Sequence, residues 1–177
     1  VVAKDDATHI GLSQQMAVHS VERAYRTIVY GGFAQDEGFV ESNLGRSKTD
    51  RKKMAVYPAS EPHTKYAYTG YKVLERFGGF TLLECRLKTG RTHQIRAHLA
   101  YLGKPVLGDI KYGNRKMNER TGTRTQALCA VRISFLDIPE ENTLHYLSGK
   151  VIKLKDPQIV KQFDALDKTK PDPAKGE

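Results

Sequence analysis

The stretch around Gly90 constrains the fold most, because the hydrophobic period changes there from that of a strand to that of a helix. Residues 80–88 alternate between apolar and charged side chains, and Leu83, Cys85 and Leu87 fall on one face. This alternation is typical of a strand that is buried on one side only. Gly90 then interrupts the pattern, and we predict that the strand ends beside it.

A helix is predicted directly after this glycine. Apolar residues recur at helical spacing at Ile95, Leu99 and Leu102. Thr92 is placed to cap the first turn, and Gly103 is placed to end the helix in a left-handed conformation. The sequence therefore predicts a strand, a turn and a helix in succession.

The predicted first turn of this helix carries cations where the helix macrodipole favours acids. They are Arg91, His93 and Arg96. Arg96 lies at the margin of the apolar stripe, and a partly buried arginine needs an anionic partner because desolvating an unpaired charge is costly. No acidic residue lies between Glu84 and Asp109. The partner must come from elsewhere in the chain or from a ligand, and a distant structural carboxylate stays an open alternative.

Two adjoining motifs resemble a known family. The segment G-R-T-H-Q-I-R-A-H at 90–98, followed by G-K-P-V-L-G-D-I-K-Y-G at 103–113, resembles the signature of the RluA/RluD-type RNA pseudouridine synthases. The resemblance implies an α+β fold with a long mixed, mainly antiparallel sheet and packed helices, and no cofactor. In that family the arginine at the position of Arg96 pairs with the catalytic aspartate. Arg96 is therefore expected to be a catalytic residue.

The first residues of the chain add an expectation about that aspartate. Val-Ala-Lys at 2–4 matches the end of a family strand that follows the motif H-R-L-D-x-x-T-S-G, but the motif itself is absent. The resemblance therefore implies that the nucleophilic aspartate belongs upstream of Val1. We expect a fragment or processed form that begins just after the nucleophile, which binds RNA but does not isomerise it by itself. A protein that never had the motif is the alternative.

A strand is predicted over residues 21–31, and it resembles the family segment K-x-Y-x-A-x-V-x-G. Tyr25 matches the family tyrosine that stacks on the target base, and Arg23 replaces the leading lysine. The resemblance implies that Tyr25 stacks on the uracil and can take a proton from it. The target base must be flipped out of folded RNA to reach such a residue. Without the resemblance, a strand tyrosine packed in the core would be the ordinary interpretation.

A basic cluster lies within 38–56, where G-R-S-x-x-D-R-x-x-M-x-V also recurs in the family. We interpret it as an arm that contacts the RNA backbone, with a solvated loop as the alternative. The predicted RNA-contacting residues are Arg46, Lys48, Arg51, Lys52, Lys53, Arg91, His93 and Gln94. For His93, a capping or surface role is the alternative.

The other elements follow from the same periodicities. We expect a helix over 5–20 capped by Asp6 or Thr8, strands over 65–77, 127–135 and 143–154, a polar loop over 114–125, and a helix after Pro157. Gly78-Gly79 predicts a hairpin turn. Asp109 is interpreted as an Asx-type turn residue rather than as a functional group.

The length of the chain suits a single domain. The 177 residues are 39% hydrophobic and carry a net charge of +9, which favours a polyanionic partner. We expect a catalytic domain over 1–167, truncated at its N-terminal side, and a disordered tail over 168–177. No apolar run approaches the length of a membrane span.

The positions of the cysteines and histidines argue against a disulfide and against a zinc site. Cys85 and Cys129 lie on predicted apolar strand faces, so we expect reduced core thiols and a cytoplasmic location. His93 and His98 are separated by about 140° around a helix, so they do not form a zinc-binding pair, and no metal site is expected.

The resemblance thus implies an enzyme that isomerises uridine in structural RNA, with large-subunit ribosomal RNA as the expected substrate, and we expect it to be a monomer. We expect neither a membrane nor a small-molecule cofactor among its partners. A non-catalytic RNA-binding or ribosome-associated protein of the same fold is the alternative. A phosphate-ligand enzyme that uses Arg91 and Arg96 as an anion clamp is a third possibility.

Overall fold

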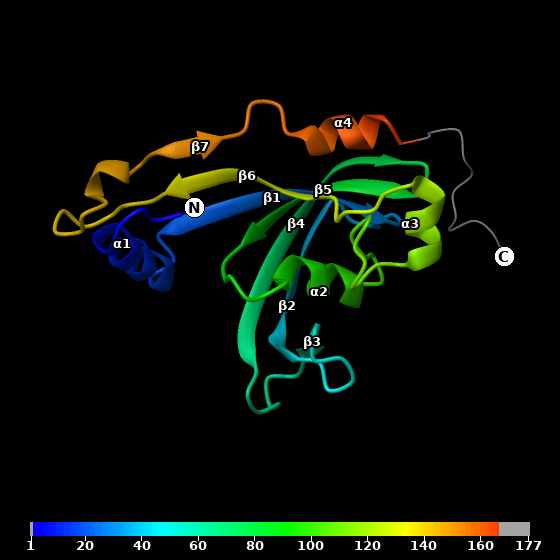
Figure 1. Cartoon of the computed structure of the whole chain (residues 1–177), viewed down its shortest axis with the longest axis horizontal. Helices are drawn as coiled ribbons and strands as arrows, with labels where there is room; N and C mark the ends of the chain where they lie inside the picture. The colour runs from blue at the N-terminus through cyan, green and yellow to red at the C-terminus, as the bar shows by residue number, and fades with distance from the viewer. Residues whose placement is uncertain (1, 167–177) are drawn as a thin grey trace.

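A computed structural model of the chain describes residues 2–166, so Val1 and the expected tail over 168–177 lie outside the described residues. This part contains a seven-stranded sheet of order β3-β2-β4-β5-β1-β6-β7, and all its neighbouring strands pair antiparallel (Figure 1). The strands are β1 (Val21–Tyr30), β2 (Glu37–Arg46), β3 (Met54–Tyr57), β4 (Lys65–Phe77), β5 (Phe80–Leu87), β6 (Leu128–Phe135) and β7 (Val151–Lys153). The helices are α1 (Asp6–Ala17), α2 (Gln94–Tyr101), α3 (Arg115–Thr121) and α4 (Gln158–Asp164), and a short 3-10 helix spans His145–Leu147. The α+β class with a mainly antiparallel sheet is confirmed.

The hairpin of β4 and β5 forms the centre of the sheet, as the double glycine predicted. Gly78 and Gly79 have φ angles of 55° and 80°, which glycine adopts without steric cost, and they join the paired residues Phe77 and Phe80. β5 then pairs with β1 along eight positions, which include Tyr25 opposite Cys85.

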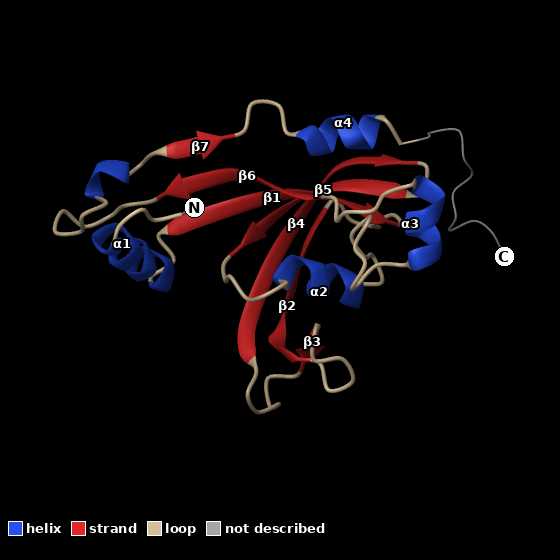
Figure 2. Ribbon diagram, viewed as in Figure 1, coloured by secondary structure: helices blue, strands red, loops and turns tan. Residues whose placement is uncertain are grey.

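The sheet separates two cores (Figure 2). On one face, Leu83 and Cys85 of β5 pack against Ile95 and Leu99 of α2. Burial raises the pKa of the Cys85 thiol to about 12, so this thiol is unreactive at neutral pH. The other face holds a cluster that includes Ile28, Leu82, Ile159 and Phe163, and α4 covers it.

α1 packs on the same face as α2, at the far end of β1. Leu12 and Met16 of this helix contact a cluster that includes Val21 of β1. The cap is Asp5, one residue before the predicted Asp6, and its carboxylate accepts a hydrogen bond from the Thr8 N–H at 2.8 Å. The helix is shorter than the predicted range of 5–20. We call the side of the sheet that carries both helices the α1/α2 face.

Two other predictions about elements were wrong. The expected loop over 114–125 contains α3, which Asn114 caps at its start and Gly122 ends with a φ of 65°. An exposed helix of seven residues buries few apolar side chains, so its sequence lacks a hydrophobic period. The expected strand over 143–154 forms a strand only at Val151–Lys153. Among residues 2–166, no helix combines the length and apolar character that spanning a membrane requires.

Candidate functional site

The first turn of α2 begins differently from the prediction. The N-cap is His93 rather than Thr92, and His93 adopts a left-handed conformation with φ 54° and ψ 21°. Its side chain makes no capping hydrogen bond. A non-glycine residue with positive φ is uncommon and strained, so the surrounding contacts must hold it in place.

Gln94 supplies much of that restraint. Its Oε1 accepts hydrogen bonds from the Thr89 hydroxyl at 2.8 Å and from the Arg91 N–H at 2.9 Å. Its Nε2 donates to the Tyr68 carbonyl at 2.9 Å and to Thr69 Oγ1 at 3.0 Å. The residue is 2% exposed. The prediction that Gln94 contacts RNA was wrong, because its side chain is buried and joins the turn to β4.

His98 has a similar structural role one turn later. It is fully buried, with Nδ1 2.9 Å from Thr69 Oγ1 and Nε2 3.0 Å from Ser42 Oγ. Burial lowers the pKa of His98 to about 4, so the imidazole is neutral at physiological pH. It therefore anchors α2 to β2 and β4.

Arg96 has an anionic partner within the chain. Its Nε and Nη2 donate to Asp109 Oδ2 at 2.6 Å and to Oδ1 at 2.8 Å, a bidentate pair. The two side chains are 12% and 0% exposed. The distant structural carboxylate, which the sequence left as an open alternative, is therefore present and is Asp109. Nη1 has no hydrogen-bond partner within residues 2–166, so one edge of the guanidinium stays free for a ligand.

The resemblance places the nucleophilic aspartate upstream of Val1, beyond the residues that surround Arg96 in the described structure. Val1 is outside the described residues, and the motif that would carry the aspartate is not part of the 177 residues. The described chain shows instead that the pairing of Arg96 does not depend on that aspartate. A contact between Arg96 and an upstream aspartate stays a prediction.

Asp109 is held as a carboxylate although it is buried. Burial alone would raise its pKa, but the hydrogen bonds from Arg96 and from two backbone N–H groups outweigh that effect, so the pKa lies below its ordinary value. Those N–H groups belong to Lys111 and Tyr112, at 2.9 and 3.1 Å from Oδ1. The predicted Asx turn is thus present. Sequence analysis missed that the same carboxylate also pairs with Arg96.

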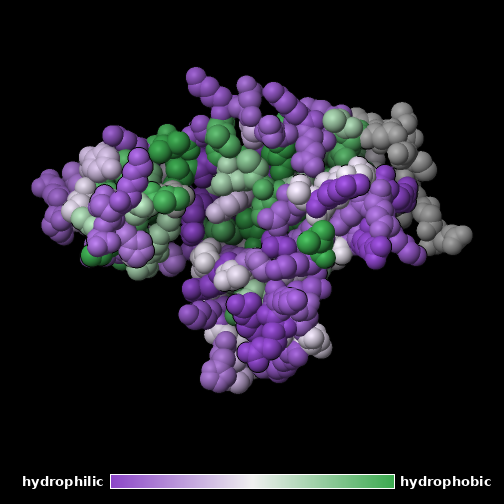
Figure 3. Space-filling view, viewed as in Figure 1, coloured by the Kyte–Doolittle hydropathy of each residue, from purple (hydrophilic) through white to green (hydrophobic). Residues whose placement is uncertain are grey.

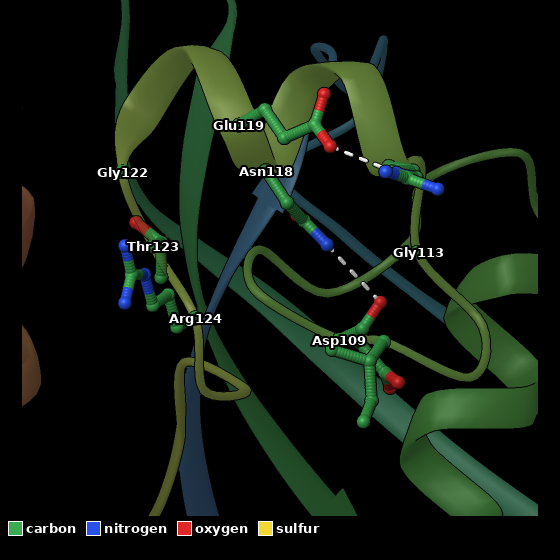
Figure 4. Close-up of a pocket in the computed structure, with 9 residues that line it drawn as sticks. Asp109, Gly113, Asn118, Glu119, Gly122, Thr123 and Arg124 are labelled. Atoms are coloured by element: carbon green, nitrogen blue, oxygen red, sulfur yellow. Dashed lines mark hydrogen bonds and ion pairs between the residues drawn. The ribbon is translucent and has the colours of Figure 1, made fainter.

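α3 fixes the loop that carries Asp109. The Asn118 amide donates to the Asp109 backbone carbonyl at 3.2 Å, as Figure 4 shows. Its Oδ1 accepts from the Gly108 N–H at 2.8 Å and from the Tyr30 hydroxyl at 3.1 Å. A Cβ at Gly113 would lie 2.2 Å from the Asp109 carbonyl oxygen, so only glycine fits there. A cavity of about 450 Å³ lies between this loop and α3.

Tyr112 connects the Arg96 pair to His93. Its ring lies 5.0 Å from the Arg96 guanidinium carbon, and its hydroxyl accepts a hydrogen bond from the Met54 N–H at 2.6 Å. The hydroxyl proton can therefore point to His93 Nδ1, 3.0 Å away, which makes Nε2 the protonated nitrogen of the neutral ring. Burial and the positive charge of Arg96 lower the pKa of His93, so its ring is neutral at pH 7.

Tyr25 lies on the α1/α2 face, on the open part of the sheet between the two helices. It is half-buried and packs against the cluster that contains Ile95. A cavity of about 420 Å³ opens beside it, and Figure 3 shows apolar residues across this part of the surface. The lining residues are Met16, Arg23, Tyr25, Ala130, Val131, Arg132, Ile133, Ile152, Lys153 and Leu154.

The predicted basic arm is the turn between β2 and β3. Lys48 pairs with Glu61 at 2.7 Å, while Lys53 lies 3.8 Å from Asp50. Arg46 donates to the Arg51 carbonyl at 3.2 Å. Exposed pairs of this kind contribute little to stability. The exposed side chains of Arg51 and Lys52 have no ion pair in the described part of the chain.

The contacts do not support an anion clamp made of Arg91 and Arg96. Arg91 Nε donates to the Tyr66 carbonyl at 2.8 Å, and the edge of Arg96 formed by Nε and Nη2 is taken by Asp109. Metal chemistry has no candidate site within residues 2–166, where no three histidine, cysteine or acidic side chains are grouped to hold an ion.

The antiparallel sheet with α2 and the buried Arg96–Asp109 pair defines a protein of the α+β class. The sequence profile described as RNA pseudouridylate synthase matches residues 1–101, and the chain belongs to this family. An uncharacterised RNA pseudouridine synthase from Bacillus subtilis is 44% identical over 76% of this chain and 42% of its own length. A protein named ribosomal large subunit pseudouridine synthase D from Zymomonas mobilis is 39% identical over 86% of this chain and 46% of its own length.

Solved structures show the same fold. Human RNA pseudouridylate synthase domain containing 1 superposes with a TM-score of 0.66 at 24% identity, over 97% of this chain and 76% of the human chain. Human RNA pseudouridylate synthase domain containing 4 superposes with a TM-score of 0.69 at 21% identity, over 94% of this chain and 70% of the human chain. The chain spans less than half the length of the two curated bacterial relatives.

Proposed function

We propose that the protein converts uridine to pseudouridine in structural RNA, with large-subunit ribosomal RNA as the preferred substrate. Family membership supports the reaction class, and the name of the Zymomonas mobilis relative supports the substrate. The observation that carries the proposal is the position of Tyr25. It lies in the wall of a cavity on the open sheet between α1 and α2, where a flipped base can enter.

The reaction exchanges one glycosidic bond for another. The bond from uracil N1 to ribose C1′ breaks, the detached ring turns, and a bond from C5 to C1′ forms while C5 loses its proton and N1 gains one. Tyr25 stacks on the uracil and can accept the C5 proton. Arg96 is oriented by Asp109, and its free Nη1 can bind the carboxylate of an aspartate nucleophile.

Residues 1–177 contain no H-R-L-D motif, so we propose that this polypeptide binds RNA without isomerising it. The carboxylate of Asp109 does not replace the nucleophile, because it is buried and engaged by Arg96 and by the Asx turn. The monomeric state and the cytoplasmic location stay predictions.

Tritium release from RNA labelled at uracil C5 tests the proposal. The assay compares the chain alone with the same chain joined behind a segment that carries H-R-L-D. We expect release only from the joined protein, and none when the aspartate of that segment is changed to asparagine. RNA binding with no release from either protein would instead favour a non-catalytic RNA-binding protein.

A further inference from the structure

Arg23 is a half-buried cation with no partner in the described part of the protein. It lies on β1, two residues before Tyr25, so both side chains project from the α1/α2 face. Its Nε is buried and has no hydrogen-bond partner. Its guanidinium takes part in no ion pair or hydrogen bond within residues 2–166.

This situation differs from that of the other cation at the site. Arg96 is compensated by a bidentate carboxylate, whereas the cavity beside Arg23 holds two further basic residues, Arg132 and Lys153, and no acidic residue lines it among residues 2–166. An unpaired guanidinium that is partly removed from water is unfavourable until an anion binds it. The basic side chains beside this cavity are therefore suited to bind an anion.

Gly90 creates the space in which this guanidinium lies. A Cβ at residue 90 would be 2.8 Å from Arg23 Nη1 and 3.2 Å from Nη2. The clash would be with the end of a flexible side chain, so a larger residue would displace the guanidinium without breaking the backbone. The absence of a side chain at Gly90 thus lets the Arg23 guanidinium lie against the turn that precedes α2.

We propose that Arg23 binds a phosphate of the RNA strand, next to the uridine that stacks on Tyr25. Alternate residues of a strand lie about 6.8 Å apart, and single strands carry a phosphate at each nucleotide. The planar guanidinium suits bidentate binding of phosphate oxygens. This inference rests on the proposed function, because it places the base on Tyr25.

A comparison of uridine with uridine 5′-monophosphate tests the contact directly. Binding of each to the chain is followed by NMR titration for the wild type, Arg23→Gln and Arg26→Gln. Arg26 is the matched control, because it is also half-buried with an unpartnered Nε but lies on the opposite face, in register with Glu84. We expect Arg23→Gln to weaken the affinity for uridine 5′-monophosphate by about tenfold and to leave the affinity for uridine unchanged.

Salt dependence gives a second readout with a short uridine-rich RNA. One lost phosphate contact lowers the slope of log K against log salt by about 0.7 for a single strand. Arg23→Gln should show this loss, Arg23→Lys should restore the slope, and Arg26→Gln should keep it. Gly90→Ala should reproduce the loss, because it displaces the guanidinium while the protein stays folded.

The outcomes separate the two proposals. A Tyr25→Leu variant that loses uridine binding, together with Arg23→Gln that behaves as Arg26→Gln, would overturn the phosphate contact and leave the proposed function standing. Wild-type protein that binds neither the nucleotides nor the RNA would overturn both. Retention of the full slope in Gly90→Ala and Arg23→Gln alike would also exclude a phosphate at this position.

Discussion

At the scale of single residues, the site depends on how the chain compensates a charge. Sequence analysis correctly inferred that Arg96 is partly buried and needs an anion. It could not identify Asp109, because the helix and the reversal after Gly103 bring together residues that are thirteen positions apart. The sequence indicated that Arg96 needs an anionic partner, but only the tertiary structure identifies that partner as Asp109.

Removing the carboxylate should be costly. We expect Asp109→Asn to lower the free energy of unfolding by about 3–5 kcal/mol, because it leaves the buried Arg96 uncompensated. Urea denaturation measures the change. Glu119→Gln, which removes an exposed pair with Arg115, should cost no more than about 0.5 kcal/mol. Equal effects of the two variants would contradict the importance of the buried pair.

His98 should make stability depend on pH. Its folded pKa of about 4 lies below the ordinary value of 6.5, so the unfolded chain binds a proton more readily between these limits. Stability from this residue is complete above pH 6.5 and falls as the pH drops toward 4, by about 3 kcal/mol in total. NMR titration of the imidazole should show no protonation near pH 6. A midpoint there would show that the ring is not desolvated.

At the scale of elements, hydrophobic periodicity predicted the helices and strands that bury an apolar face in the core. β1, β4, β5 and α4 were found because their apolar residues alternate or recur every three to four residues. α3 was missed, because its polar helix is held by Asn114, Asn118 and their partners rather than by an apolar stripe.

Asn118 should couple α3 to the Asp109 loop. Asn118→Ala removes the partners of the Gly108 N–H, the Tyr30 hydroxyl and the Asp109 carbonyl, so we expect a loss of about 2–3 kcal/mol. Asn114→Ala, which removes only the helix cap, should cost about 1 kcal/mol. Hydrogen exchange at the Gly108 amide should accelerate in the first variant and stay slow in the second.

At the scale of the whole molecule, the residues of the candidate site lie on one side of the sheet, the α1/α2 face. α1 and α2 cover the two ends of the α1/α2 face and leave Tyr25 open between them, and the β2–β3 turn extends from the same sheet (Figure 1). The resemblance predicted the α+β class and the family. The open position between two helices could not be read from the sequence, because it depends on which face each helix covers.

The β2–β3 turn should contribute to RNA affinity without sequence preference. We expect the double variant Arg51→Ala, Lys52→Ala to lower the salt slope of single-stranded RNA binding by about 1.4. Fluorescence anisotropy across a salt series measures it. The double variant Lys150→Ala, Lys161→Ala, which removes two exposed lysines elsewhere, should keep the wild-type slope. Equal losses in both would mean that the turn has no special part in binding.

The bidentate pair of Arg96 with Asp109 also bears on the thermodynamics of complex formation. An arginine that is already immobilised in the empty protein has given up its rotamer entropy during folding, so an incoming anion need not restrain it again. Binding of an anion to this guanidinium should therefore show a small entropic penalty in calorimetry, because the side chain does not have to be ordered when the anion binds.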